Sequence, residues 1–270
     1  MPDPAVTETV ISADGTVIAV DRCGTGPAVV LVHGAFTDRT HPTLVEVAAA
    51  LAPWFTVFNY DRRGRGASGD SPDYAVEREL EDIDAVIEAA GGAAMVFGGS
   101  SGSALALRAA ARSPQVITRL AVWEPPYHVS GDAPHLPLDF AGQLAALVEC
   151  GRRAAAVELF MVQAAEVPRE AVAAMRGDPS WAATEALAHT LAYEAHVMGP
   201  DNPLPAALLS AVGQPTLVLY GDSSPAWMTK AALAVADAVP HAVIRRLERQ
   251  THNVAADALV PELLEFLARA

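Results

Sequence analysis

Short apolar runs rich in β-branched residues recur along the chain, and stretches with helical spacing separate them. Runs of this length and composition are typical of buried β-strands. They cover residues 17–20, 28–32, 55–59, 94–97, 120–123, 216–220 and 243–247. Strands that alternate with helices form βαβ units, so the pattern predicts an α/β fold with a mostly parallel β-sheet flanked by helices.

The clearest helical pattern lies between the third and fourth of these runs. Val76, Leu80, Ile83 and Ile87 recur at helical spacing, and two glycines follow at 91 and 92. Acidic residues at 79, 81, 82 and 84 occupy other positions of the same segment. Charge on the exterior of a helix usually faces water, so we expect an amphipathic helix with a solvated acidic face.

The alternation stops after Trp123, and no strand-like run returns before Thr216. Helical stretches at 140–148, 154–164 and 181–197 fill this interval, and prolines separate them. A helical excursion inside an α/β sheet indicates an inserted cap. We therefore expect an α/β core made of residues 1–124 and 214–270 and a helical cap made of residues 125–213.

Length and charge narrow the classes of protein to consider. A chain of 270 residues can bury one large core. Its formal net charge of −14 disfavours nucleic acid or an anionic membrane as a partner, because phosphate groups bind dense Lys and Arg. The N-terminal residues lack the basic start and apolar run of a leader, and no later stretch reaches the roughly 18 apolar residues of a membrane span.

The two cysteines bear on disulfide bonds and metal sites. Cys23 and Cys150 are far apart in sequence and form no CxxC pair, so they predict neither a disulfide framework nor a zinc site. We expect a soluble cytoplasmic protein without a metal.

The strongest chemical signal is a GxSxG pattern formed by Gly98, Ser100 and Gly102. It lies between the strand-like run at 94–97 and an apolar helix that begins near Ser101. A nucleophile elbow requires a strained turn at this place, and small neighbouring residues let strand and helix approach closely enough to form it. Ser100 is therefore the predicted nucleophile.

Further motifs follow in a fixed order. The strand-like run at 28–32 leads into HGAF at 33–36, YDRRGRGASGD begins at Tyr60, GGSSG ends at Gly102, and a histidine lies late in the chain. In this order and spacing the motifs resemble the α/β-hydrolase family over nearly the whole chain apart from the cap. The resemblance implies an oxyanion hole built from the backbone N–H groups of Ala35 and Ser101, and a structural role for His33.

The general base should follow the nucleophile and the acid in the chain. His252 lies in a loop between the last strand-like run and the C-terminal helix, where an imidazole can take the serine proton if a carboxylate fixes its tautomer. The position where most of the family carries the acid holds Ser224, so the carboxylate comes from Asp222 or from Glu124. We favour Glu124, which ends the run at 120–123 and resembles the acid position of haloalkane dehalogenases.

Two other features bear on the ligand. Phe36, Trp123, Tyr127 and Trp227 are candidates for an apolar substrate pocket under the cap. Gly64, Gly66 and Gly69 match the GxGxxG pattern of dinucleotide-binding enzymes, but that pattern should open a helix, and Ser71-Pro72 places the next helix later. We therefore expect no cofactor, and we interpret Asp61, Arg62 and Arg63 as a loop clamp.

The sequence thus predicts an enzyme, a serine hydrolase that cleaves a carboxylic ester, thioester or lactone of a small hydrophobic substrate through an acyl-enzyme. Two alternatives stay open. One is a non-hydrolytic enzyme on the same scaffold, such as a cyclase or acyl transferase of secondary metabolism, and the other is a ligand-binding receptor. The natural substrate and the oligomeric state are not encoded in any pattern that we recognise.

Overall fold

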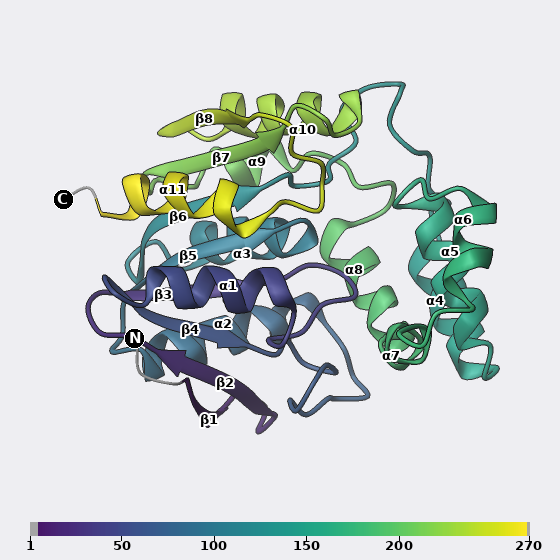
Figure 1. Ribbon diagram of the computed structural model, residues 1–270, viewed down its shortest axis with the longest axis horizontal. Coiled ribbons are helices and arrows are strands. Elements are labelled where there is room, and N and C mark those ends of the chain that lie inside the picture. The colour runs from purple at the N-terminus through teal and green to yellow at the C-terminus, as the bar shows by residue number, and fades with distance from the viewer. Residues whose placement is uncertain (1–4, 269–270) are drawn as a thin grey trace.

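The computed structural model describes residues 5–268 and contains one mixed sheet with helices on both faces (Figure 1). Its strands are β1 Val6–Ile11, β2 Val17–Cys23, β3 Ala28–Val32, β4 Thr56–Tyr60, β5 Ala94–Gly99, β6 Ile117–Trp123, β7 Thr216–Gly221 and β8 Ala242–Leu247. They are ordered β1-β2-β4-β3-β5-β6-β7-β8. Among the described strands only the pairs β1–β2 and β2–β4 are antiparallel, so the predicted mostly parallel sheet is confirmed.

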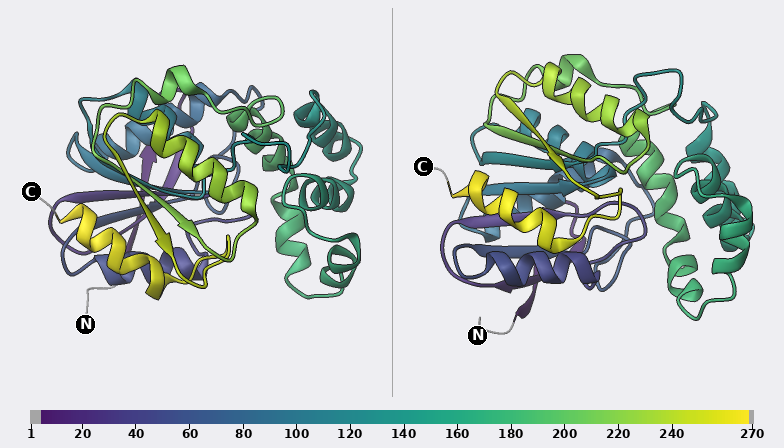
Figure 2. Two further views of the ribbon diagram at one scale, coloured as in Figure 1. Left: turned by 90° about the horizontal axis from the view of Figure 1, so that it is seen from above. Right: turned by 45° about the horizontal axis from the view of Figure 1, so that its top comes forward.

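Helices cover the two faces of the sheet in separate layers. The helices are α1 Pro42–Leu51, α2 Val76–Ala89, α3 Ser101–Arg112, α4 Phe140–Glu149, α5 Arg153–Gln163, α6 Arg169–Met175, α7 Trp181–Ala186, η1 Ala188–Thr190, α8 Leu191–Met198, α9 Ala206–Leu209, α10 Ala226–Ala238 and α11 Ala256–Leu267. Helices α1 and α11 pack on one face, and α2, α3 and α10 pack on the other (Figure 2). Alternate residues of β3 serve the two layers, as the strand period of two requires: Val29 and Leu31 face α1, whereas Val30 and Val32 face α3.

The segment between β6 and β7 contains helices and only one isolated bridge, from His128 to Pro203. Figure 1 shows α4 to α7 beyond the end of the sheet where the parallel strands finish. These helices share an apolar cluster of their own with the start of α8. By contrast Val197, Leu209 and Val212 pack into the main core, so the end of the interval predicted as cap lies against the α/β core. The division of the chain into core and cap at residues 124 and 213 stays a prediction.

The stretch 181–197 was expected to be helical throughout, but the structure breaks it into α7, η1 and α8. The Arg153 side chain donates hydrogen bonds to the carbonyls of Glu185 and Ala186, at 2.8 and 2.6 Å. Thr190 Oγ1 donates to the Leu187 carbonyl at 2.8 Å. These side chains satisfy carbonyls that a continuous helix would bond to its own backbone, which lets the chain turn before α8.

Candidate active site

Ser100 occupies the tight turn between β5 and α3, with φ of 56° and ψ of −129°. This region of backbone space is costly for a residue with a side chain, and it persists where the surrounding structure enforces it. The glycines on either side of Ser100 show how the surrounding structure enforces this conformation. A Cβ on Gly98 would lie 2.5 Å from the Gly102 carbonyl oxygen, and one on Gly102 would lie 2.4 Å from the Val32 carbonyl oxygen. Strand and helix therefore approach too closely for any larger residue at these two positions.

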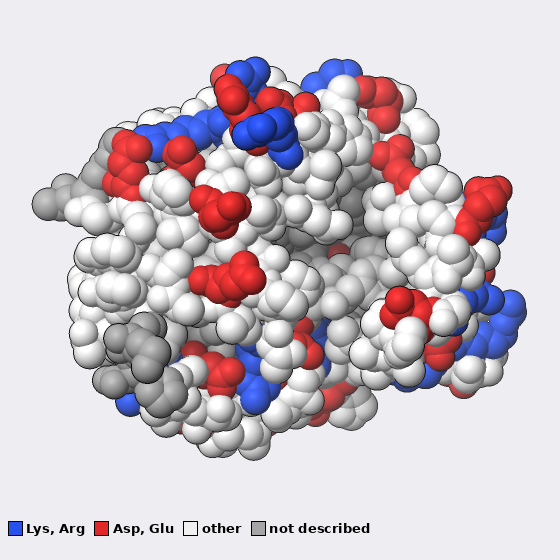
Figure 3. Space-filling view, in the orientation of Figure 1, with Lys and Arg blue, Asp and Glu red and all other residues white. Residues whose placement is uncertain are grey.

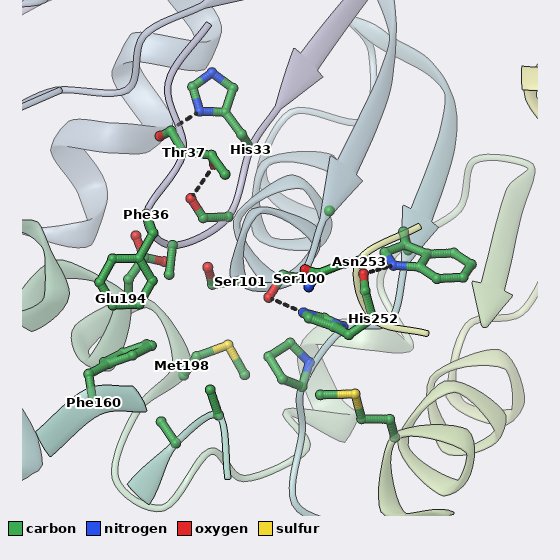
Figure 4. Close-up of a pocket in the computed structure, with 18 of the residues that line it drawn as sticks. His33, Phe36, Thr37, Ser100, Ser101, Phe160, Glu194, Met198, His252 and Asn253 are labelled. Atoms are coloured by element: carbon green, nitrogen blue, oxygen red, sulfur yellow. Dashed lines mark hydrogen bonds between the residues drawn. The ribbon is translucent and has the colours of Figure 1, made fainter. Parts of the chain in front are cut away.

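His252 lies in the loop between β8 and α11, and its ring points toward Ser100 (Figure 4). Its Nε2 is 3.0 Å from Ser100 Oγ. The indole N–H of Trp123 donates to the His252 carbonyl at 2.9 Å, which ties this loop to the end of β6. The imidazole is therefore held at hydrogen-bond distance from the hydroxyl.

Glu124 follows directly after β6 and is fully buried. Its Oε2 is 2.7 Å from His252 Nδ1, and its Oε1 accepts the Gly221 N–H at 2.8 Å. The second candidate, Asp222, accepts the Arg249 N–H at 2.6 Å instead. Of the two carboxylates considered from sequence, the structure brings Glu124 to His252.

The two residues whose amides are expected to form an oxyanion hole both lie at the cavity that contains Ser100. Ala35 and Ser101 line the same cavity as Ser100, and Gly34 packs so closely that a Cβ there would be 2.8 Å from Ser100 Cβ. The Ser100 carbonyl accepts the Ser103 N–H at 2.9 Å, so this peptide group runs along α3. The Ser101 N–H consequently points out of the N-terminus of the helix, where backbone donors lack intrahelical partners.

His33 precedes this loop and is buried against two backbone carbonyls. Its ring nitrogens contact the carbonyl oxygens of Tyr60 and Thr37. Burial and the positive charges of Arg65 and Arg62 lower the pKa of His33 to about 3. The ring is therefore neutral near pH 7 and supports the loop that carries Ala35.

A buried cluster of charges lies behind the same loop. Arg62 donates to both oxygens of Glu79 at 2.6 Å, and Glu194 from α8 accepts hydrogen bonds from Arg62 and Arg65. All four side chains are at most 2% exposed. Glu79 and the similarly buried Asp82, which pairs with Arg63, show that the expected solvated acidic face of α2 is wrong at these positions. Burial of several arginines demands carboxylate partners, and α2 supplies two of them.

The cavity above Ser100 has a volume of about 640 Å³ and opens between the sheet and the cap helices (Figure 3). Phe36 and Trp123 line it, as expected, together with apolar residues that no motif indicated. These include Leu136, Phe140, Phe160, Met161, Met198 and Met228.

Tyr127 and Trp227 are a correction, because neither lines this cavity. Tyr127 is fully buried in the main core. Trp227 packs with Ala133 and Met228, and its indole N–H donates to Glu166. Both aromatic rings serve packing rather than the site.

The remaining expectations concern metals, cofactors and membranes. No group of three or more His, Cys, Asp or Glu side chains suited to a metal occurs within residues 5–268. The GxGxxG stretch forms a loop well before α2, and Gly66 packs against the Asp61 carboxylate, so this stretch does not open a helix. None of the described helices is long and apolar enough to cross a bilayer.

Comparison with known proteins places this geometry in a wider group. A crystal structure of an α/β hydrolase from Sphaerobacter thermophilus is 52% identical and has a TM-score of 0.90, with 97% of this chain and 100% of that chain covered. A thermophilic esterase from Thermogutta terrifontis shares the fold at 22% identity and a TM-score of 0.73, with 98% of each chain covered.

Among curated sequences, the uncharacterized hydrolase YraK of Bacillus subtilis is 35% identical over 108 residues, which span 38% of either chain. The profile of the Alpha/beta hydrolase family matches residues 29–262. The sheet order and the elbow at Ser100 agree with this match. The chain belongs to the α/β-hydrolase family, because this profile matches most of its length.

Proposed function

We propose that this protein is a serine hydrolase that cleaves a carboxylic ester, thioester or lactone through an acyl-enzyme. The observation that carries the proposal is the continuous contact from Ser100 Oγ through the His252 ring to the buried carboxylate of Glu124. A hydroxyl is a weak nucleophile on its own, and a histidine whose tautomer is fixed by a carboxylate activates it. The family itself hosts many reactions, so the proposal rests on the site and not on the fold.

The geometry supports a two-step reaction. With its Nδ1–H donated to Glu124, the neutral ring of His252 presents the lone pair of Nε2 to Ser100. As Ser100 Oγ attacks the carbonyl carbon, Nε2 takes the hydroxyl proton and passes it to the leaving oxygen or sulfur. The amides of Ala35 and Ser101 then hydrogen-bond to the negative oxygen of the tetrahedral intermediate. Water activated by the same ring releases the acid and restores Ser100.

The lining of the cavity favours an uncharged, hydrophobic substrate. No Lys or Arg is among its described lining residues, and the carboxylate of Glu194, which does line it, is already paired with Arg62 and Arg65. A substrate carboxylate buried here would lack a cationic partner, which costs binding free energy. We therefore propose a neutral acyl group of modest size, with contacts to Phe36, Phe160 and Met198.

Turnover of a matched set of esters tests this proposal. Nitrophenyl esters from acetyl to octanoyl should be hydrolysed by the wild-type protein, and Ser100→Ala should remove the activity without unfolding the chain. The half-ester of succinic acid should show a kcat/KM at least about tenfold below that of butyrate, which is similar in size but uncharged.

Absence of turnover with every neutral ester would contradict the proposal. If one small molecule then bound tightly without being changed, the receptor alternative would gain support. A non-hydrolytic product formed in a Ser100-dependent way would support the cyclase or transferase alternative.

A further inference from the structure

The loop that carries Ala35 is fixed from behind by buried guanidinium groups. Arg65 Nη1 donates to the carbonyl oxygen of Gly34 and, at 3.2 Å, to that of Thr37. Arg62 Nη1 donates to the His33 carbonyl at 3.0 Å. Thr37 Oγ1 adds a second hydrogen bond to the Gly34 carbonyl at 2.8 Å. Three carbonyls of this short loop, those of His33, Gly34 and Thr37, therefore accept hydrogen bonds from the arginines of the charge cluster.

These contacts determine where one amide points. Within residues 5–268 no peptide bond is cis, and in a planar trans peptide the C=O and the following N–H point in opposite directions. Because Arg65 and Thr37 hold the Gly34 carbonyl, the Ala35 N–H must point the opposite way, away from the Arg65 guanidinium, and Ala35 lines the cavity. Rotation of this one peptide group would replace the N–H with a carbonyl oxygen, which would repel a developing oxyanion.

Arg65 is itself held by a residue from the cap. Its Nη2 donates to Glu194 Oε1, and Glu194 is the carboxylate that α8 contributes to the cluster. The cluster contains two arginines, Arg62 and Arg65, and two carboxylates, Glu79 and Glu194. Without Glu194 one buried positive charge would lack its counter-ion, a costly state in the protein interior. The cap therefore completes the environment in which Arg65 can reach the Gly34 carbonyl.

We propose that Arg65, held by Glu194, is a positioning residue for the oxyanion hole, and that through this contact the cap sets the orientation of the Ala35 amide. The inference rests on the proposed function, since it assumes that a negative oxygen develops next to Ala35. It assigns to Arg65, the third arginine of the RRGR stretch at 62–65, a role in transition-state binding. Arg65 does not touch the substrate, because its effect passes through the Gly34–Ala35 peptide.

The chain offers a matched control in Arg63. This arginine is as deeply buried as Arg65 and also pairs with carboxylates, Asp82 and Asp14, but its remaining hydrogen bond goes to the Arg78 carbonyl and not to the loop at 33–37. Replacement of either arginine with lysine keeps the charge and removes the planar fork. A merely structural role would give the two variants similar kinetic effects at equal stability.

The test compares Arg65→Lys with Arg63→Lys at a temperature where circular dichroism shows both folded. For Arg65→Lys we expect kcat to fall about 100-fold with KM changed less than about threefold, because loss of one oxyanion donor weakens only the transition state. A trifluoromethyl ketone, which forms a tetrahedral adduct with the serine, should bind about 100-fold more weakly. Arg63→Lys should keep kcat within about threefold of wild type.

Two further variants keep the inference testable if Arg65→Lys does not fold. Thr37→Val removes the second hydrogen bond to the Gly34 carbonyl and should lower kcat about fivefold without a change in KM. Glu194→Gln keeps an acceptor for Arg65 but removes the charge, and should lower kcat and analogue affinity in parallel.

Wild-type kcat in folded Arg65→Lys, or in both Thr37→Val and Glu194→Gln, would overturn the inference, as would an equal loss in Arg63→Lys. A wild-type protein that hydrolyses no ester would instead refute the proposed function, so the two failures are distinguishable.

Discussion

Replacement of Glu124 with glutamine should abolish most of the activity while leaving the shape of the site unchanged. The carboxylate is fully buried, and each of its oxygens accepts one N–H, from His252 and from Gly221. Glutamine has one acceptor oxygen and one NH₂ group that can only donate. If the oxygen faces Gly221, the NH₂ meets Nδ1 of His252 and stabilises the tautomer that carries its proton on Nε2. That tautomer cannot accept the proton of Ser100.

The opposite orientation of the glutamine is no better, because its NH₂ would then face the N–H of Gly221 with no acceptor between them. The wrong tautomer in a Ser–His–Asp site lowers kcat about 10⁴-fold, and we expect a loss of about 10³- to 10⁴-fold here. At about 1.36 kcal/mol per factor of ten, this equals roughly 4 to 5.5 kcal/mol of transition-state stabilisation.

Steady-state hydrolysis of a neutral nitrophenyl ester measures this effect, with Asp222→Asn as the control. Asp222 accepts the backbone N–H of Arg249, so its amide variant should retain kcat within about threefold. Retention of more than a tenth of the wild-type kcat by a folded Glu124→Gln protein would refute the assignment of the acid. A larger loss in Asp222→Asn than in Glu124→Gln would refute it too.

Three further predictions concern stability. Gly102→Ala should destabilise the fold by at least about 2 kcal/mol in thermal unfolding, because its Cβ would lie 2.4 Å from the Val32 carbonyl oxygen. A Cβ on Gly99 would have no atom beyond its chain neighbours within 4 Å, so Gly99→Ala should change stability by less than about 1 kcal/mol, and equal effects of the two variants would contradict the close approach at Gly102. Glu79→Ala should lower the free energy of unfolding in urea by about 3 to 5 kcal/mol, because it leaves Arg62 short of a counter-ion. Glu77 is exposed, so Glu77→Ala should lower it by at most about 0.5 kcal/mol, and an equally small loss in Glu79→Ala would refute the buried cluster. The lowered pKa of His33 means that below about pH 6.5 the unfolded chain binds a proton that the folded chain does not, so the free energy of unfolding falls as the pH drops. Between pH 7 and pH 5 His33 should account for about 2 kcal/mol of this fall, and His33→Gln should reduce the measured pH dependence by that amount. An unchanged pH dependence would show that the ring is protonated in the folded protein.

The local patterns of the sequence predict most of the fold. All seven predicted strands occur in the sheet, because each combines β-branched residues with a clear boundary. Strand β1, Val6–Ile11, was missed. It lies at the antiparallel edge of the sheet and alternates exposed and half-buried residues, so it lacks the continuous apolar run of the buried parallel strands.

The site could be predicted where the chemistry depends on a local turn or motif. The elbow at Ser100 is local, since its glycines must be small to let β5 meet α3. The choice between Glu124 and Asp222 is not local, because it depends on how the ends of β6 and β7 sit relative to the loop of His252. The structure favours the strand end of β6, where the carboxylate can reach both Gly221 and the imidazole.

The pairing of the buried charges could not be predicted from the sequence. Glu79 lies on an apparently solvated helix face, and its partner Arg62 is 17 positions away in a loop. Glu194 is separated from Arg65 by 129 positions and sits in a helix of the cap. Three arginines within RRGR, next to a loop that must be buried, are the feature that could have prompted a search for acidic partners.

The central claim is that Ser100 is an activated nucleophile, and covalent labelling tests it most directly. The purified protein would be treated with a fluorophosphonate, and the modified residue would be located by peptide mass spectrometry, with Ser100→Ala and His252→Ala as controls. The account predicts rapid labelling confined to Ser100, no labelling of Ser100→Ala, and labelling slowed by several orders of magnitude in His252→Ala. No labelling of folded wild-type protein, or labelling at another residue, would contradict it.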